Sequence, residues 1–105
     1  MAINFKVTLR QNPNEIHLRL NGDFDGSSAC ELLNILKKSC QLVSRVILHT
    51  NGLRYIYPFG SSLFRNHLSD LKHRKHLLLE FTGVHARELD PDGVTLHFIK
   101  SERYS

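Results

Sequence analysis

The 105-residue chain contains no tryptophan, one methionine, three prolines and two cysteines. Its uninterrupted apolar runs, such as Leu77–Leu79, are only three residues long, far shorter than a membrane-spanning helix requires. The N-terminal residues lack the apolar stretch of a signal peptide, and no low-complexity tract follows them. We therefore predict a single domain over residues 1–105, located in the cytoplasm and without a membrane span.

The two cysteines and the modest charge restrict the partners further. Cys30 and Cys40 lie ten residues apart in one predicted helix, which separates them by about 15 Å and prevents a disulfide between them. Free thiols are typical of a reducing cytoplasm. The net charge of +4 comes from scattered basic residues, apart from a dense run at residues 72–76. No aromatic side chains interleave with that run to stack on bases, so we expect no nucleic-acid partner.

Alternation of apolar and polar residues predicts strands near both ends of the chain. In residues 3–9 and 15–21 the apolar positions that we expect to face inward are Ile3, Phe5, Val7, Leu9, Ile16, Leu18 and Leu20. The turn residues 11–14 between these strands predict an antiparallel hairpin. Residues 94–99 alternate again and predict a last strand, which follows a loop at residues 89–93.

Two stretches with helical spacing lie between strands that are apolar without alternation. Ser27 or Ser28 can cap the first helix, with Glu31 in its first turn, and Asp25 is expected either to cap the same helix or to hold the preceding loop. The second helix is expected to begin near Gly60. His67 falls within the apolar stripe of the second helix, so we expect it to be partly buried. The apolar strands, residues 45–50 and 77–81, are typical of parallel strands with both faces covered.

The order of these segments predicts an α/β domain. Its mixed sheet begins with the antiparallel hairpin and continues with parallel strands joined by right-handed crossover helices. Only about ten residues separate Gly83 from the last predicted strand, so a third helix there is expected to be short or absent.

Three segments resemble the STAS domain, the family of bacterial anti-sigma-factor antagonists and sulfate-transporter tails. They are LRLNGDFD (residues 18–25), RVILHTNGLRYIYPFGSSLFRNHL (residues 45–68) and LLLEFTG (residues 77–83), and the resemblance extends over residues 3–83. It implies a non-enzymatic regulatory module that binds a protein partner, such as an anti-sigma-factor-like kinase. The oligomeric state does not follow from it.

The resemblance also implies where the partner binds, namely the turn after the third strand and the neighbouring loop. The residues at these positions are Tyr57, Pro58, Phe59, Gly60, Ser61, Ser62 and Arg65, with Asp23 and Asp25. Phe59 occupies the position of the hydroxyl that the kinase phosphorylates, Tyr57 and Pro58 replace an acid and another hydroxyl, and His49 replaces the strand-end Asp. A phosphate switch therefore looks absent, unless Ser61 or Ser62 is modified instead. Tyr57 and Phe59 either protrude as an apolar patch or fold back over the sheet edge.

Other site chemistries find weaker support in the sequence. His73 and His76, with His67 or Asp70 nearby, offer an incomplete ligand set, so we predict no metal site and no cofactor. No nucleophile motif or phosphate-binding glycine loop occurs, and we predict no enzymatic activity. His17 and His97 fall on polar or edge faces of strands, with nothing that joins them. The alternative function is a small-molecule or nucleotide sensor that uses the same turn.

Overall fold

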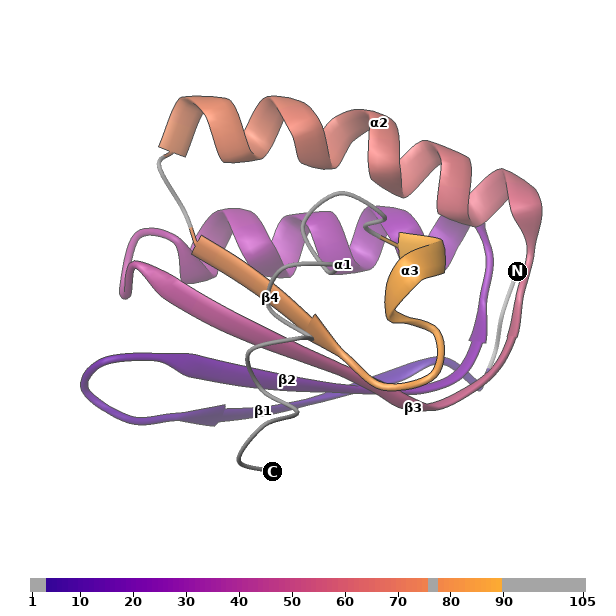
Figure 1. Cartoon of the computed structure of the whole chain (residues 1–105), viewed down its shortest axis with the longest axis horizontal. Helices are drawn as coiled ribbons and strands as arrows, with labels where there is room; N and C mark the ends of the chain where they lie inside the picture. The colour runs from indigo at the N-terminus through magenta and orange to yellow at the C-terminus, as the bar shows by residue number, and fades with distance from the viewer. Residues whose placement is uncertain (1–3, 76–77, 90–105) are drawn as a thin grey trace.

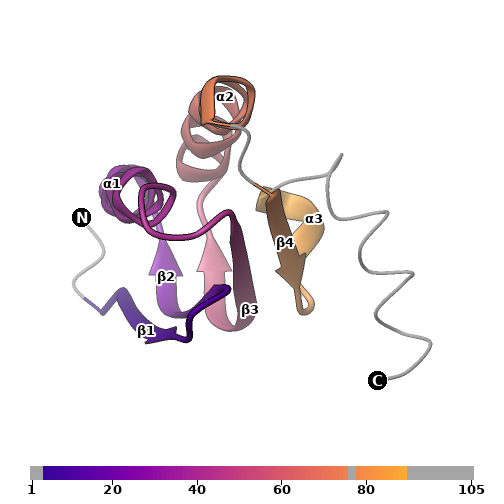
Figure 2. The same ribbon diagram turned by 90° about the vertical axis from the view of Figure 1, so that its left-hand side faces the viewer.

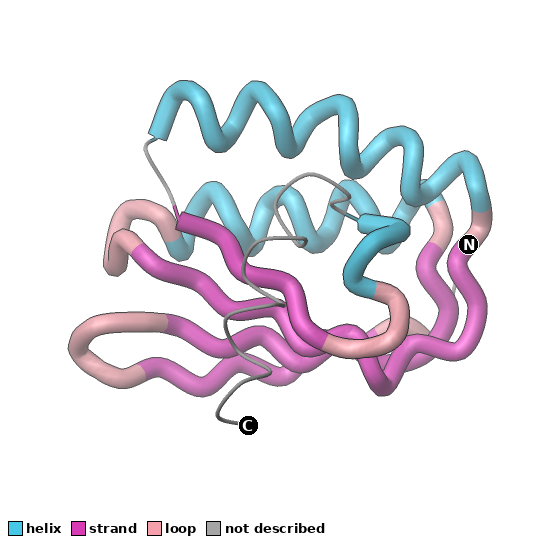
Figure 3. The backbone as a smooth tube through the Cα atoms, viewed as in Figure 1, coloured by secondary structure: helices cyan, strands magenta, loops and turns pink. Residues whose placement is uncertain are grey.

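The computed structural model of the chain describes residues 4–75 and 78–89, except for the side chains of residues 72–75. These residues form, in order, β1 (Lys6–Gln11), β2 (Ile16–Phe24), α1 (Gly26–Ser39), β3 (Arg45–Ile56), α2 (Pro58–Lys75), β4 (Leu78–Thr82) and α3 (Ala86–Leu89). The strands lie side by side in the order β1-β2-β3-β4 (Figures 1 and 3). β1 runs antiparallel to β2, whereas β2, β3 and β4 are parallel, which confirms the predicted mixed α/β sheet.

The hydrophobic core fills the space between the sheet and the two long helices, which cover the same face (Figure 2). Its fully buried residues come from three strands and both helices: Leu18, Leu20, Leu32, Leu36, Val46, Leu48, Phe64 and Phe81. Burying each such side chain contributes about 1.5–3 kcal/mol. Phe64 stands edge-on to Phe24 and to Phe81, with ring centroids 5.8 and 6.2 Å away, and so ties α2 to the sheet. Val46, Ile47 and Leu48 are all buried, as their unbroken apolar run predicts.

The first strand is less buried than its alternation predicts. Phe5 is buried and Val7 is half-buried, but Leu9 is 49% exposed. β1 is the edge strand of the described sheet, so its later residues extend beyond the cover of the helices. Ile3 lies outside the described residues.

Of the candidate caps of α1, Asp25 is the one that the structure uses, and neither Ser27 nor Ser28 is the N-cap. The extended backbone of Asp25 follows directly from the end of β2. Glu31 consequently lies beyond the first turn. α2 begins at Pro58 rather than at Gly60, because the fixed φ angle of proline and its missing N–H suit the first position of a helix.

The remaining expectations have mixed outcomes. His67 is exposed rather than partly buried, and its Nδ1 lies 3.0 Å from the Leu63 carbonyl oxygen on the outer side of α2. The expected short third helix is α3, with four residues. The predicted strand at residues 94–99 and His97 lie outside the described residues, as do the side chains of His73 and His76. No helix in the described ranges is long and apolar enough to cross a bilayer.

Candidate functional site

The predicted partner-binding residues meet where the carboxyl ends of β2 and β3 lie side by side. Asp23 pairs with Tyr55, and Phe24 pairs with Ile56, in the parallel register of the two strands. Each strand continues into a helix within two residues, and the Tyr57 amide donates a hydrogen bond to the Phe24 carbonyl oxygen over 2.9 Å. The first turns of α1 and α2 therefore start next to each other at one end of the sheet (Figure 1).

Gly60 allows this close approach of the two helices. A Cβ atom at this position would lie 2.6 Å from the carbonyl carbon of Asp25 and 2.7 Å from its oxygen. Real Cβ atoms do not approach backbone atoms so closely, so only glycine fits between the helix starts. Asp25 itself accepts hydrogen bonds at Oδ1 from the amide and the hydroxyl of Ser28, both over 3.0 Å. Burial raises the pKa of Asp25 and these bonds lower it, and on balance the pKa lies below its ordinary value.

Three aromatic rings protrude from this junction, and we call them the aromatic corner: Tyr55, Tyr57 and Phe59. Their exposed fractions are 54%, 45% and 71%. Tyr55 and Tyr57 pack edge to face with ring centroids 4.6 Å apart, and the edge of Phe59 lies over Gly26 at the start of α1. Of the two arrangements that the sequence left open, the structure has the exposed one. Exposed rings held in place by their neighbours are typical of protein-binding surfaces.

The other predicted site residues have local partners. Ser61 is buried, and its hydroxyl donates to the Pro58 carbonyl oxygen over 3.1 Å, whereas Ser62 is exposed. Asp23 lies 3.4 Å from the Arg54 guanidinium. Arg65 donates from Nη1 to the Glu88 carbonyl oxygen over 2.8 Å and so reaches toward the end of α3.

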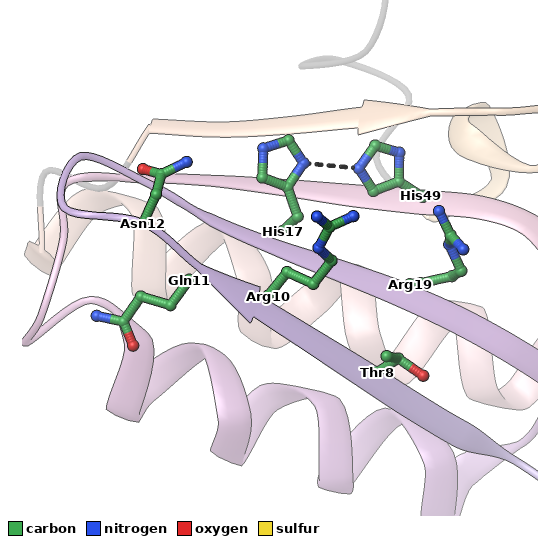
Figure 4. A pocket seen from close by; sticks show the side chains of 7 residues that line it. All are labelled: Thr8, Arg10, Gln11, Asn12, His17, Arg19 and His49. Carbon is green, nitrogen blue, oxygen red and sulfur yellow. Dashed lines mark hydrogen bonds between the residues drawn. The ribbon is translucent and has the colours of Figure 1, made fainter.

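A second polar cluster, which the sequence analysis missed, lies on the sheet face away from α1 and α2. His17 of β2 and His49 of β3 point the same way, and His17 Nδ1 lies 2.9 Å from His49 Nε2 (Figure 4). The rings are nearly parallel, with centroids 5.2 Å apart. The chain of contacts continues from His17 Nε2 to Glu15 Oε2 at 2.8 Å and from His49 Nδ1 to Thr82 Oγ1 at 3.1 Å. The signal in the sequence was a histidine at an outward position in each of two adjacent strands.

This chain of side chains is complete when both imidazoles are neutral. Thr82 then donates to His49, His49 donates to His17, and His17 donates to the Glu15 carboxylate. The hydrogen bond from His17 lowers the pKa of Glu15 against the opposing effect of burial, and the charge of Arg45 adds to it. Burial, followed by the charges of His17 and Arg19, lowers the pKa of His49. Within the described residues, no three potential ligands are placed to hold a metal ion.

Comparisons with known proteins show which solved structures share this fold. No family model and no curated protein matches the chain. Among solved structures, the unphosphorylated anti-sigma factor antagonist SpoIIAA aligns over 94% of this chain and 97% of its own, with a TM-score of 0.60 and 14% identity. An uncharacterised DUF3478 protein with a SpoIIAA-like fold, from Shewanella loihica PV-4, aligns over 76% of this chain and 66% of its own, with a TM-score of 0.53 and 10% identity. Both likenesses agree with the resemblance in the sequence, and the chain therefore adopts the STAS-like fold.

Proposed function

We propose that this chain is a non-enzymatic regulatory module that binds a protein partner through the aromatic corner, without a phosphate switch at the usual position. The observation that carries the proposal is the exposure of Tyr55, Tyr57 and Phe59 where α1 and α2 begin. The likeness to an anti-sigma factor antagonist supports a partner of the anti-sigma-factor type, such as a kinase of that class. The binding surface extends from the corner over Pro58 and Ser62, which are exposed, whereas Gly60 and Ser61 are buried beneath it.

Charged groups beside the corner supply the polar rim of this surface. Asp23 and Arg54 form an exposed pair on one side, and Asp25 caps α1 below Phe59. Arg65 lies further along α2 and extends the surface toward α3. Charges at a rim steer the approach of a partner and set its orientation, whereas the aromatic rings, which the partner would cover, provide most of the affinity.

The chemistry of the turn favours a partner that is bound constitutively. Phe59 has no oxygen to accept a phosphoryl group, and the Ser61 hydroxyl is buried and bound to the Pro58 carbonyl oxygen. A phosphate carries about −1.5 to −2 charges, which is enough to disrupt a neighbouring apolar contact. Without it, affinity is set by the amount of partner and not by modification of the corner.

Binding to a purified anti-sigma-factor-type kinase from the same genome tests the proposal. Tyr57→Ala with Phe59→Ala should weaken binding at least about tenfold, because truncating central aromatic contacts typically costs 2 kcal/mol or more. Leu42→Ala is the matched control, since Leu42 is 64% exposed and lies in the loop after α1, at the opposite end of the sheet. Unchanged affinity in the aromatic double variant, or an equal loss in the control, would refute the docking surface.

The absence of a switch is tested separately by mass spectrometry. After incubation with the kinase and ATP, we expect residues 57–62 to remain unmodified. Phosphate on Ser62, which is exposed, together with loss of kinase binding, would show that the switch has moved along the helix. In a Phe59→Ser variant the usual position regains a hydroxyl, so phosphate at residue 59 of that variant would show that the kinase still recognises the turn.

A further inference from the structure

The sheet face opposite α1 and α2 carries a hollow of about 360 Å³. It is lined by residues of β1, the hairpin turn, β2 and β3: Thr8, Arg10, Gln11, Asn12, His17, Arg19 and His49. In Figure 4 the side chains of Arg10 and Arg19 extend toward the two imidazoles. The lining offers guanidinium, imidazole, amide and hydroxyl groups but no carboxylate among the described residues. The two guanidinium groups are the donors that suit an acceptor-rich ligand, because the imidazole nitrogens are bonded to each other, to Glu15 and to Thr82.

The positive charge of this hollow is not neutralised within the described part of the chain. Neither Arg10 nor Arg19 forms a side-chain hydrogen bond or ion pair with a described residue. In contrast, the acidic side chains on the same face, Glu15 and Glu80, are both paired with Arg45, at 3.2 and 2.8 Å. Two guanidinium groups without acids beside them favour an anion, because charge-assisted bonds from arginine to phosphate or carboxylate oxygens are among the strongest in proteins.

The histidine pair adds a group whose charge responds to a ligand. When the pair takes up one proton, His17 donates to His49 and His49 donates to Thr82, while the Glu15 carboxylate stabilises the imidazolium. The positive charges of Arg10 and Arg19 disfavour protonation of the pair, and an anion bound in the hollow would offset that repulsion. The pair therefore gains a proton more readily when the hollow is occupied.

We propose that this hollow binds a phosphate monoester about the size of a sugar phosphate, with the phosphate beside Arg10, Arg19 and the His17–His49 pair. The volume lies at the low end of the range for small-molecule pockets, about 300–1,000 Å³, which favours a sugar phosphate over a larger ligand. Thr8 and Asn12 supply the polar contacts for the organic part, whereas the side chain of Gln11 points away from the imidazoles (Figure 4). The site lies on a different face from the aromatic corner, so it stands independently of the proposed function.

Titration of the whole chain with inorganic phosphate and with ribose 5-phosphate, followed by ¹H–¹⁵N NMR, tests this site. We expect the largest shifts at the side chains of Arg10, Arg19, His17 and His49, tighter binding of ribose 5-phosphate than of phosphate, and no binding of ribose. Arg10→Gln with Arg19→Gln should weaken binding at least about tenfold, since two charge-assisted contacts are lost. These arginines are exposed, so their replacement should not prevent folding.

Arg54→Gln with Arg87→Gln is the matched control, because it removes the same charge from exposed positions elsewhere. This control should change affinity by less than about twofold in physiological salt. An equal loss of affinity in the two double variants would show that only the net charge of the chain matters, and this result would overturn the proposal. Absence of binding at millimolar ligand, or shifts confined to residues 57–62, would overturn it as well.

A second measurement tests the imidazole pair with sulfate, whose charge does not change at neutral or mildly acidic pH because hydrogen sulfate is a strong acid. Glu15 and Thr82 contact the pair, and Arg10 and Arg19 line the hollow beside it. Arg45 follows through its ion pair with Glu15, and Glu80 through its ion pair with Arg45. Protonation of an imidazole adds a positive charge beside the bound anion, so sulfate should bind more tightly at the lower pH, and His17→Gln with His49→Gln should remove that dependence. A flat profile in the unaltered chain would show that the pair does not contribute.

Discussion

Replacing Gly60 with alanine sets two effects of opposite sign against each other. Alanine is favoured over glycine within a helix by about 1 kcal/mol. However, the new Cβ would lie 2.6–2.8 Å from three backbone atoms of Asp25, so the start of α2 must move away from that of α1. Overpacking of this kind costs about 1–3 kcal/mol, and disturbing the Asp25 cap adds about 1 kcal/mol. We therefore expect Gly60→Ala to lower the free energy of unfolding by about 1–3 kcal/mol.

Gly26→Ala provides the matched control, because Gly26 is the first residue of α1 and Gly60 likewise lies in the first turn of α2. Its Cβ would meet the Phe59 ring at 2.9 Å, but that ring is 71% exposed and can rotate away. This variant should remain within about 0.5 kcal/mol of the unaltered chain. Urea unfolding measures the free energy of unfolding of both variants, provided that their m-values equal that of the unaltered chain. The thermal midpoints of the variants should differ by about 4–8 °C for each kcal/mol of difference in stability. If Gly60→Ala proves as stable as the unaltered chain, the close helix approach is not a constraint on this fold.

Two further predictions concern titratable groups. Asp25→Ala should cost about 1 kcal/mol of stability, and Asp25→Asn should cost less because asparagine also caps helices. The pKa of Asp25 is lowered in the folded chain, so the stability that its carboxylate contributes is present at neutral pH and is lost as pH falls through the folded pKa. Equal losses in both variants would contradict a capping role. The pKa of His49 is lowered as well, so the unfolded chain binds its proton more readily, and stability should decline as pH drops below about 6.5. Urea unfolding at about pH 7.5 and pH 5.5 should show a smaller decline for His49→Gln than for the unaltered chain, and an identical decline would refute the assignment.

The secondary structure followed from local patterns because most of its determinants are close in sequence. Period-two alternation located β2, and helical spacing located the buried stripe of α1 at Ala29, Leu32 and Leu36. The Asp25 cap of α1 is also a local signal, whereas the start of α2 lies two residues before Gly60 because Pro58 takes the first position of that helix. Leu9 and His67 were misjudged because their burial depends on how far neighbouring elements extend, which no local pattern contains.

By itself, the sequence determined the α/β class, the turn that holds Tyr57, Pro58 and Phe59, and the lack of a hydroxyl at position 59, since these depend on residue type and short-range spacing. Only the tertiary structure decided that the three rings of the aromatic corner are exposed and that Gly60 lies against Asp25. It alone joined His17 to His49, which are 32 residues apart along the chain. Such a contact requires the parallel register of β2 and β3, and that register is set by the packing of α1 and α2 against the other face of the sheet.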